Sequence, residues 1–230
     1  MSGSSKLRLL TAAELVEEQQ RGTLVLDVRP AEQFASLHIR GSIQISLMGH
    51  FASWAAILIK PSQRLALVAE NVQGAEEAHT RLIRVGLGHV IGYSLADEAE
   101  WRKEGIDLAS ISIHRCANVR QTLERDPSLQ LVDVRSRAEW LKGHLPGAIP
   151  LPLLDLDPKK RGIDPSKPSL VYCHEGYRAT TATSILLRES AGDVSILIDG
   201  VEGWLALGLP LETSDTRPSD SDRPSFPSLL

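Results

Sequence analysis

The stretch LVYCHEGYR, residues 170–178, decides the fold of this chain. Its first three residues are apolar and predict the end of a buried strand, and residues 179–190 after it carry a helical pattern. The sequence therefore predicts a strand, a tight loop and a helix, with Cys173 at the point where the strand ends. Backbone N–H groups and the positive end of the helix dipole converge at such a loop. The site thus favours an anion, and hence the thiolate form of Cys173.

The composition is that of a globular protein and excludes several classes of partner. Of the 230 residues, 42% are hydrophobic and 23% charged, and a net charge of −4 gives no reason to expect binding to nucleic acid or membranes. The sequence shows neither the ~18-residue apolar run of a membrane span nor the apolar core of a signal peptide. Two cysteines make no disulfide framework, so we expect a reducing, cytoplasmic compartment. The seven histidines have no metal-binding spacing, so we expect neither a metal nor another cofactor.

The chain contains one pattern twice. Asp27-Val28-Arg29 recurs as Asp133-Val134-Arg135 at an offset of 106 residues (133 − 27), and the same offset takes His38 to His144. Later matches follow at offsets of 104 and 103, a drift that small differences in loop length explain. Two copies of one domain of about 100 residues follow from this period.

Within each copy, short apolar runs alternate with amphipathic helical patterns. The runs are 24–28, 65–68 and 90–93 in the first copy, and 129–134, 170–173 and 194–198 in the second. A capping box from Thr11 to Glu14 opens a helix before the first run. This alternation is typical of an α/β fold, so we expect two domains, each a central, mostly parallel sheet flanked by helices. The expected boundaries are a first domain at 1–108, a linker at 109–117, a second domain at 118–213 and a disordered tail at 214–230.

The second copy resembles the rhodanese family at three places. Residues 133–135 together with 139–148 resemble the first family signature, and the C-x-x-G-x-R pattern of 173–178 resembles the active loop. Residues 199–204, DGVEGW, resemble the closing segment. The resemblance covers nearly all of the second half of the chain. It implies an α/β domain with a central parallel sheet and a persulfide formed on the loop cysteine.

The first copy resembles the same family but lacks its sulfur. At an offset of 104 (173 − 69), Ala69 stands at the position of Cys173, and the loop 69–74, AENVQG, has neither cysteine nor arginine. Glu70 also places a negative charge where the second copy has His174. We therefore interpret the first copy as a catalytically silent rhodanese-like domain.

The two-domain arrangement resembles the tandem rhodanese module of metallo-β-lactamase/rhodanese fusion proteins, with a silent first and an active second domain. Residues 51–55 and 65–70 carry this part of the resemblance, whereas the HxHxDH zinc motif is absent from the sequence. The resemblance implies a metallo-β-lactamase-fold, persulfide-oxidising protein as a partner or fusion domain.

Cys173 is the candidate catalytic nucleophile. The resemblance implies a sulfurtransferase that moves a sulfane sulfur from thiosulfate or a persulfide to cyanide or a thiol by double displacement. The alternative is a buried, inert cysteine. Phosphatases of a similar fold use a C-x5-R loop. The C-x4-R loop from Cys173 to Arg178 is shorter and fits one sulfur atom better than a phosphate.

The remaining loop residues are candidates for binding the substrate. Arg178 closes the loop and is the second candidate catalytic residue, because its guanidinium can donate to carbonyls or to a substrate anion. Gly176 lets the loop turn. We expect His174, Glu175 and Tyr177 to point outward and contact the substrate, with solvated loop positions as the alternative. The charge of Glu175 opposes a small anion such as thiosulfate, so a larger persulfide-bearing thiol or a protein donor is a fair alternative.

Asp133 and Arg135 are candidate supporting residues. They follow a predicted parallel strand, at the edge where open α/β sheets bind ligands, and could orient the loop. The same pair in the silent copy, Asp27 and Arg29, favours a structural role. We expect Cys116 to be a plain linker cysteine, with a resolving thiol as the alternative.

Two further functions stay open beside sulfur transfer. One is a non-catalytic interaction module in which Cys173 is vestigial. The other is the sulfur-carrier half of a persulfide-oxidising system whose oxidising partner lies elsewhere.

Overall fold

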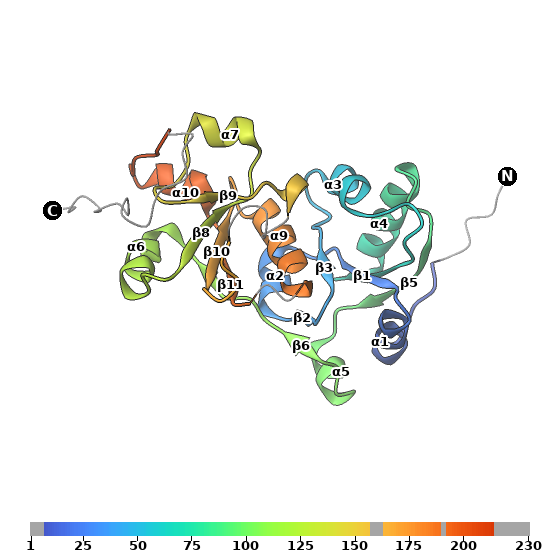
Figure 1. Cartoon of the computed structure of the whole chain (residues 1–230). Coiled ribbons are helices and arrows are strands. Elements are labelled where there is room, and N and C mark those ends of the chain that lie inside the picture. The colour runs from blue at the N-terminus through green and yellow to red at the C-terminus, as the bar shows by residue number, and fades with distance from the viewer. Residues whose placement is uncertain (1–6, 157–162, 190–191, 214–230) are drawn as a thin grey trace. The chain divides into compact units, whose positions relative to one another are not determined.

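The computed structural model describes residues 7–156, 163–189 and 192–213 (Figure 1). The chain divides into two compact units, Met1–Ser110 and Ile111–Leu230, and each has its own sheet. Parallel sheets flanked by helices in both units confirm the predicted fold class. The tail expected over 214–230 lies outside the described residues. Every helix in the described ranges is too short or too polar to cross a lipid bilayer.

The first unit is built on a parallel four-stranded sheet with the strand order β3-β1-β4-β5. Its strands are β1 (Leu24–Asp27), β3 (Ile43–Gln44), β4 (Leu65–Ala69) and β5 (Val90–Leu95). A short antiparallel pair, β2 (His38–Ile39) and β6 (Leu108–Ala109), lies apart from this sheet. The carboxyl ends of β1, β4 and β5 therefore share one edge.

Helices cover both faces of the first sheet. They are α1 (Ala12–Gln20), α2 (Ala31–Ser36), α3 (Phe51–Leu58), α4 (Val72–Arg84) and α5 (Glu98–Lys103). Alternate residues of β4 enter two cores: Leu67 packs with α3 and α4, whereas Val68 packs with Leu15 of α1 and Trp101 of α5. The predicted capping box is present, since the Thr11 hydroxyl accepts from Glu14 N and the Glu14 carboxylate accepts from Thr11 N.

The second unit is built on a parallel five-stranded sheet with the strand order β7-β11-β10-β8-β9. Its strands are β7 (Ile113–His114), β8 (Gln130–Asp133), β9 (Ile149–Pro150), β10 (Ser169–Tyr172) and β11 (Val194–Leu197). Its helices are α6 (Cys116–Arg125), α7 (Arg137–Lys142), the short 3-10 turn η1 (Leu153–Asp155), α9 (Tyr177–Arg188) and α10 (Gly200–Ala206). Strand β10 is central and places its carboxyl end in the middle of the sheet edge.

One core of the second unit packs α6, α7 and α10 onto the sheet. The indoles of Trp140 in α7 and Trp204 in α10 are buried against Tyr172 at the end of β10. Helix α9 packs against β10 and β11 (Figure 1). The segment 109–117, for which we expected a linker, holds β7 and the first residues of α6, so Cys116 begins a helix of the second unit.

Candidate functional site

The loop that follows β10 lies at the centre of the carboxyl edge of the second sheet. Strand β10 ends at Tyr172, Cys173 comes next, and α9 begins at Tyr177. Cys173 is only 1% exposed. The first N–H groups of a helix have no partner within the helix, so the start of α9 offers N–H donors and a positive dipole to an anion in this loop. This is the strand, loop and helix that the sequence predicts.

The first turn of α10 holds the Cys173 loop through its backbone. Val201 N donates to Cys173 O and Glu202 N donates to His174 O, both at 3.0 Å. Gly200 makes this approach possible: its φ is +53°, and a Cβ there would lie 2.4 Å from the Cys173 carbonyl oxygen. Gly176 turns the loop with a φ of +85°, and a Cβ there would lie 2.6 Å from Ile198 O. Both positions thus require glycine.

Arg178, the second residue of α9, is held by Glu139 of α7. Its Nη1 and Nη2 donate to the two Glu139 oxygens at 2.8 and 2.7 Å. Glu139 Oε2 also accepts from Ser136 Oγ at 2.7 Å. The hydrogen bonds from Arg178, then those from Ser136, lower the pKa of Glu139 to about 2 against the opposing effect of burial. The bonds to Glu139 raise the pKa of Arg178, and the neighbouring charge of Cys173 adds to the rise although burial opposes it.

Glu139 is the residue of this site that the sequence reasoning missed. Ser136 and Glu139 form a capping box, which indicates a helix start and nothing more. Arg178 lies 39 residues further on, and no local pattern connects the two. The sequence suggested carbonyls or a substrate anion as partners of Arg178, whereas the structure gives it a carboxylate from the same unit.

The other loop side chains differ in exposure. His174 and Glu175 are exposed at the rim, as expected for outward-pointing residues, whereas Tyr177 is half-buried. A molecule approaching the loop from solvent therefore meets an imidazole and a carboxylate.

Asp133 and Arg135 form a buried ion pair at the end of β8, the strand that pairs with β10. Arg135 Nε and Nη2 donate to the Asp133 carboxylate at 2.7–3.0 Å, and Nη2 also donates to Gly143 O at 2.7 Å. The guanidinium lies 6.0 Å from the centre of the Tyr172 ring, and burial raises the pKa of this tyrosine well above its ordinary value. The pair thus ties the end of β8 to the end of α7, while Tyr172 stays neutral.

Comparison with known proteins assigns the family. The family model for the rhodanese-like domain matches residues 11–97 and 117–207. The chain belongs to the rhodanese-like family.

Two curated relatives bear names connected with sulfur. The "Sulfurtransferase" of Allochromatium vinosum is 30% identical over 94 residues, which are 41% of this chain and 88% of the relative. The "Putative sulfur carrier protein YrkF" of Bacillus subtilis is 26% identical over 85 residues, 37% of this chain and 46% of the relative. The family thus connects the chain with sulfur transfer in general, and two rhodanese domains in one chain confirm the tandem arrangement predicted from the repeat.

A solved structure of a thiosulfate sulfurtransferase from Pseudomonas aeruginosa is similar over 92% of this chain and 44% of its own, with a TM-score of 0.40 and 21% identity. The chain thus spans less than half the length of this protein and of the Bacillus relative.

The first rhodanese domain keeps the frame of the second but not its loop. Arg29 pairs with Asp27 and donates to Leu37 O, as Arg135 does with Asp133 and Gly143 O. Ala69 ends β4 where Cys173 follows β10, and α4 begins three residues after Ala69 (72 − 69), against four after Cys173 (177 − 173). The loop of the first domain is therefore one residue shorter as well as free of sulfur.

Cys116 is a packing residue of the second rhodanese domain. It is buried, its Sγ donates to Gly200 O at 3.3 Å, and its backbone N donates to Asp199 Oδ2 at 3.1 Å. Burial raises the pKa of Cys116 to about 12, and the charge of Asp199 adds to the effect. This thiol is therefore protonated at neutral pH. In the part of the chain that the structure describes, no group of three or more His, Cys, Asp or Glu side chains is placed to hold a metal ion.

Proposed function

We propose that this protein is a sulfurtransferase whose second rhodanese domain carries sulfur as a persulfide on Cys173. The observation that carries the proposal is the position of Cys173, at the end of the central strand and before the start of α9. The helix dipole and the N–H groups of the loop favour an anionic group at this place. The first domain has Ala69 at this place and takes no part in the covalent chemistry.

In the first step the Cys173 thiolate attacks the sulfane sulfur of a donor. A new S–S bond forms between Sγ and that sulfur, and the bond between the sulfane sulfur and the rest of the donor breaks. The leaving group takes the electron pair, as sulfite from thiosulfate or as a thiolate from a persulfide. Cys173 then carries one extra sulfur with a negative charge, which the start of α9 and the charge of Arg178 stabilise.

In the second step an acceptor removes the terminal sulfur. Cyanide or a thiolate attacks this atom, the S–S bond to Cys173 breaks, and the electron pair returns to Sγ. The products are thiocyanate or a new persulfide, together with the starting thiolate. No net oxidation occurs, so the cycle needs no redox cofactor.

Glu139 positions Arg178 for both steps in this proposal. The bidentate pair fixes the guanidinium beside the loop, so the part of its charge that Glu139 does not balance acts on the sulfur anion without a rearrangement. Arg178 then acts through its field rather than as a clamp on the donor. His174, Glu175 and Tyr177 contact the donor. Glu175 at the exposed rim disfavours a dianion such as thiosulfate and favours a larger persulfide-bearing thiol.

The test is turnover with two donors. Wild type, Cys173→Ala and the control Cys116→Ala are assayed for sulfur transfer from thiosulfate to cyanide and from glutathione persulfide to a thiol. We expect Cys173→Ala to lose transfer with every donor that wild type uses, and Cys116→Ala to keep it. Unchanged turnover in Cys173→Ala would contradict the proposal.

A second candidate is a sulfur carrier that hands its persulfide to a protein partner. It is supported by the burial of Cys173, which hinders attack by thiols in solution, and by the name of the Bacillus relative. The partner implied by the sequence is a persulfide-oxidising protein of the metallo-β-lactamase fold. A carrier keeps its loaded sulfur in the presence of free thiols and releases it rapidly to the partner, whereas an enzyme for small acceptors loses it to the thiol. If no donor loads Cys173 at all, the domain is an interaction module instead.

A further inference from the structure

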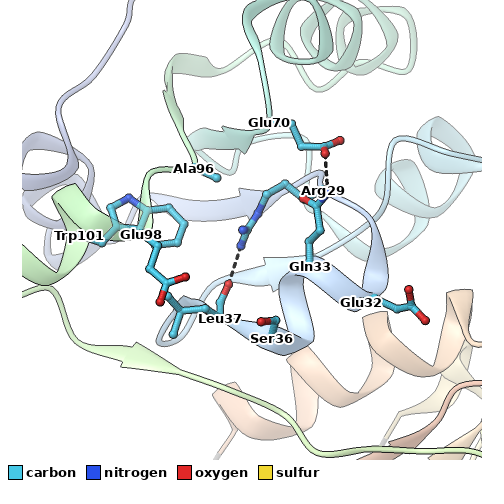
Figure 2. Close-up of a pocket in the computed structure, with 9 residues that line it drawn as sticks. All are labelled: Arg29, Glu32, Gln33, Ser36, Leu37, Glu70, Ala96, Glu98 and Trp101. Carbon is cyan, nitrogen blue, oxygen red and sulfur yellow. Dashed lines mark hydrogen bonds between the residues drawn. The ribbon is translucent and has the colours of Figure 1, made fainter.

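The first rhodanese domain has a pocket of about 570 Å³ at the carboxyl edge of its sheet (Figure 2). Arg29 follows β1, Glu70 follows β4 and Ala96 follows β5, and all three line the pocket. Ligands of open α/β sheets bind at this edge, and the volume lies within the roughly 300–1,000 Å³ of ordinary small-molecule sites. The first domain thus has no cysteine in its loop but has a pocket at the edge where such sheets bind ligands.

The floor of this pocket presents an unused hydrogen-bond donor. Arg29 is only 7% exposed, and its Nε and Nη2 are taken by Asp27 and Leu37 O. Its Nη1 donates to none of the residues that the structure describes, and Arg29 lines the pocket. Figure 2 shows the guanidinium between Trp101 on one side and Gln33 on the other. The two N–H groups of Nη1 are therefore available to an oxygen acceptor on a ligand in the pocket.

The pocket is also lined by the carboxylate of Glu70, which has no cationic partner among the described residues. Glu70 is exposed, and Gln33 Nε2 donates to its Oε1 at 2.5 Å. Three carboxylates line the pocket, those of Glu32, Glu70 and Glu98. Within the described ranges no basic side chain pairs with Glu70, whereas Glu98 is paired with Arg102 at 2.7 Å. Burial raises the pKa of Asp27 against the opposing effect of Arg29, and the charge of Glu70 adds the smallest contribution to the rise.

Together these groups select a ligand with two charges of opposite sign. The charge of Arg29 is already balanced by Asp27, so Glu70 leaves the pocket negative and favours an ammonium group. A carboxylate or phosphate alone would be repelled by Glu70, and an amine alone would leave Arg29 Nη1 without an acceptor. An α-amino acid carries an ammonium and a carboxylate on one carbon. We infer that the first rhodanese domain binds an α-amino acid, with the ammonium on Glu70 and a carboxylate oxygen on Arg29 Nη1.

The inference is tested by titrating the full chain, labelled with nitrogen-15, with L-alanine while the backbone amide signals are followed. We expect saturable shifts at residues 69–71 and 96–98. Ethylamine and propionate, which each carry one of the two groups, are expected to bind at least about tenfold more weakly, the scale of one lost charged hydrogen bond.

A pair of variants locates the site. Glu70→Gln keeps the acceptor for Gln33 and removes the charge, and we expect it to weaken L-alanine binding by at least about tenfold. The control Glu17→Gln removes an exposed charge from α1 of the same domain and is expected to leave the affinity unchanged. The inference is overturned if L-alanine gives no saturable shift through the millimolar range, if either half-molecule binds as tightly, or if Glu70→Gln binds like wild type. Because binding is read without sulfur transfer, these results are independent of Cys173.

Discussion

The substitution Gly200→Ala probes the contact that holds the Cys173 loop. The new Cβ would lie 2.4 Å from the Cys173 carbonyl oxygen and 2.5 Å from that of His174, and ordinary contacts begin at 3.4 Å. Helix α10 must therefore retreat by about 1.0 Å (3.4 − 2.4), because both opposing atoms belong to the backbone. This movement breaks the bonds from Val201 N and Glu202 N to the loop.

The expected loss of stability follows from these contacts. Each hydrogen bond contributes about 1 kcal/mol, and a side chain in the left-handed conformation costs about 1–2 kcal/mol. Gly200→Ala should therefore destabilise the second domain by roughly 3–4 kcal/mol. Gly208→Ala is the matched control, since Gly208 also has a positive φ of +70° but nothing lies within 4 Å of its new Cβ. It should cost only the conformational part, about 1–2 kcal/mol.

Urea denaturation of wild type and both variants measures the difference. Multidomain chains can unfold in more than one step, and both substitutions lie in the second domain, so the transition of the first domain serves as an internal reference. We expect a lower midpoint for Gly200→Ala than for Gly208→Ala, together with weaker persulfide loading in Gly200→Ala alone. Equal midpoints for the two variants would refute the argued contact between α10 and the loop.

Three further predictions concern the groups around the loop. Glu139→Gln should lower the free energy of unfolding by only about 1 kcal/mol, because its ion pair with Arg178 is partly exposed and screened by solvent, and it should slow sulfur transfer. The control Glu189→Gln, which removes an exposed charge from the same domain, should do neither. Equal turnover in wild type and Glu139→Gln would contradict the positioning role. The pKa of Glu139 falls from 4.5 to about 2 on folding, so its contribution to stability is present above pH 4.5 and is lost as the pH falls toward 2. Between pH 4.5 and 2 the urea midpoint should therefore fall less steeply in Glu139→Gln than in wild type. Parallel curves for the two proteins would count against this. Iodoacetamide at pH 8 should leave Cys116 unmodified in the native protein, because this thiol is buried and its pKa is raised, and should alkylate it in urea. Peptide mass spectrometry reads both states. Labelling of Cys116 in the native protein would contradict its burial and raised pKa.

The alternation of apolar runs and helical patterns predicted the fold because it is a local signal, and the repeat at an offset of 106 residues showed that the pattern occurs twice. Thr11 and Glu14 cap α1 as a capping box should, and the predicted strands agree with the observed ones to within two residues. The main differences lie at helix starts. Helix α4 begins at Val72, because the Asn71 side chain accepts from Gly74 N and caps it, and this start was not assigned from the sequence. Helix α9 begins at Tyr177 because Gly176 takes the left-handed conformation.

The contacts that build the site were beyond local sequence reasoning. Arg178 meets Glu139 across 39 residues, and Cys116 N meets the Asp199 carboxylate across 83. Tertiary packing creates such pairs, and nothing in the spacing of the residues foreshadows them. The same holds for the pocket of the first domain, whose lining comes from α2, α5 and the ends of three strands. Replacement of the cysteine by Ala69 was visible in the sequence, whereas the space left beside it was not.

The central claim is that Cys173 carries the transferred sulfur, and mass spectrometry tests it most directly. The protein is treated with thiosulfate or glutathione persulfide, and its intact mass and its cysteine peptides are compared before and after addition of cyanide. The account predicts the mass of one added sulfur atom on Cys173 and none on Cys116, lost again with cyanide and absent in Cys173→Ser. An unloaded Cys173 with every donor, or the same added mass in Cys173→Ser, would contradict it.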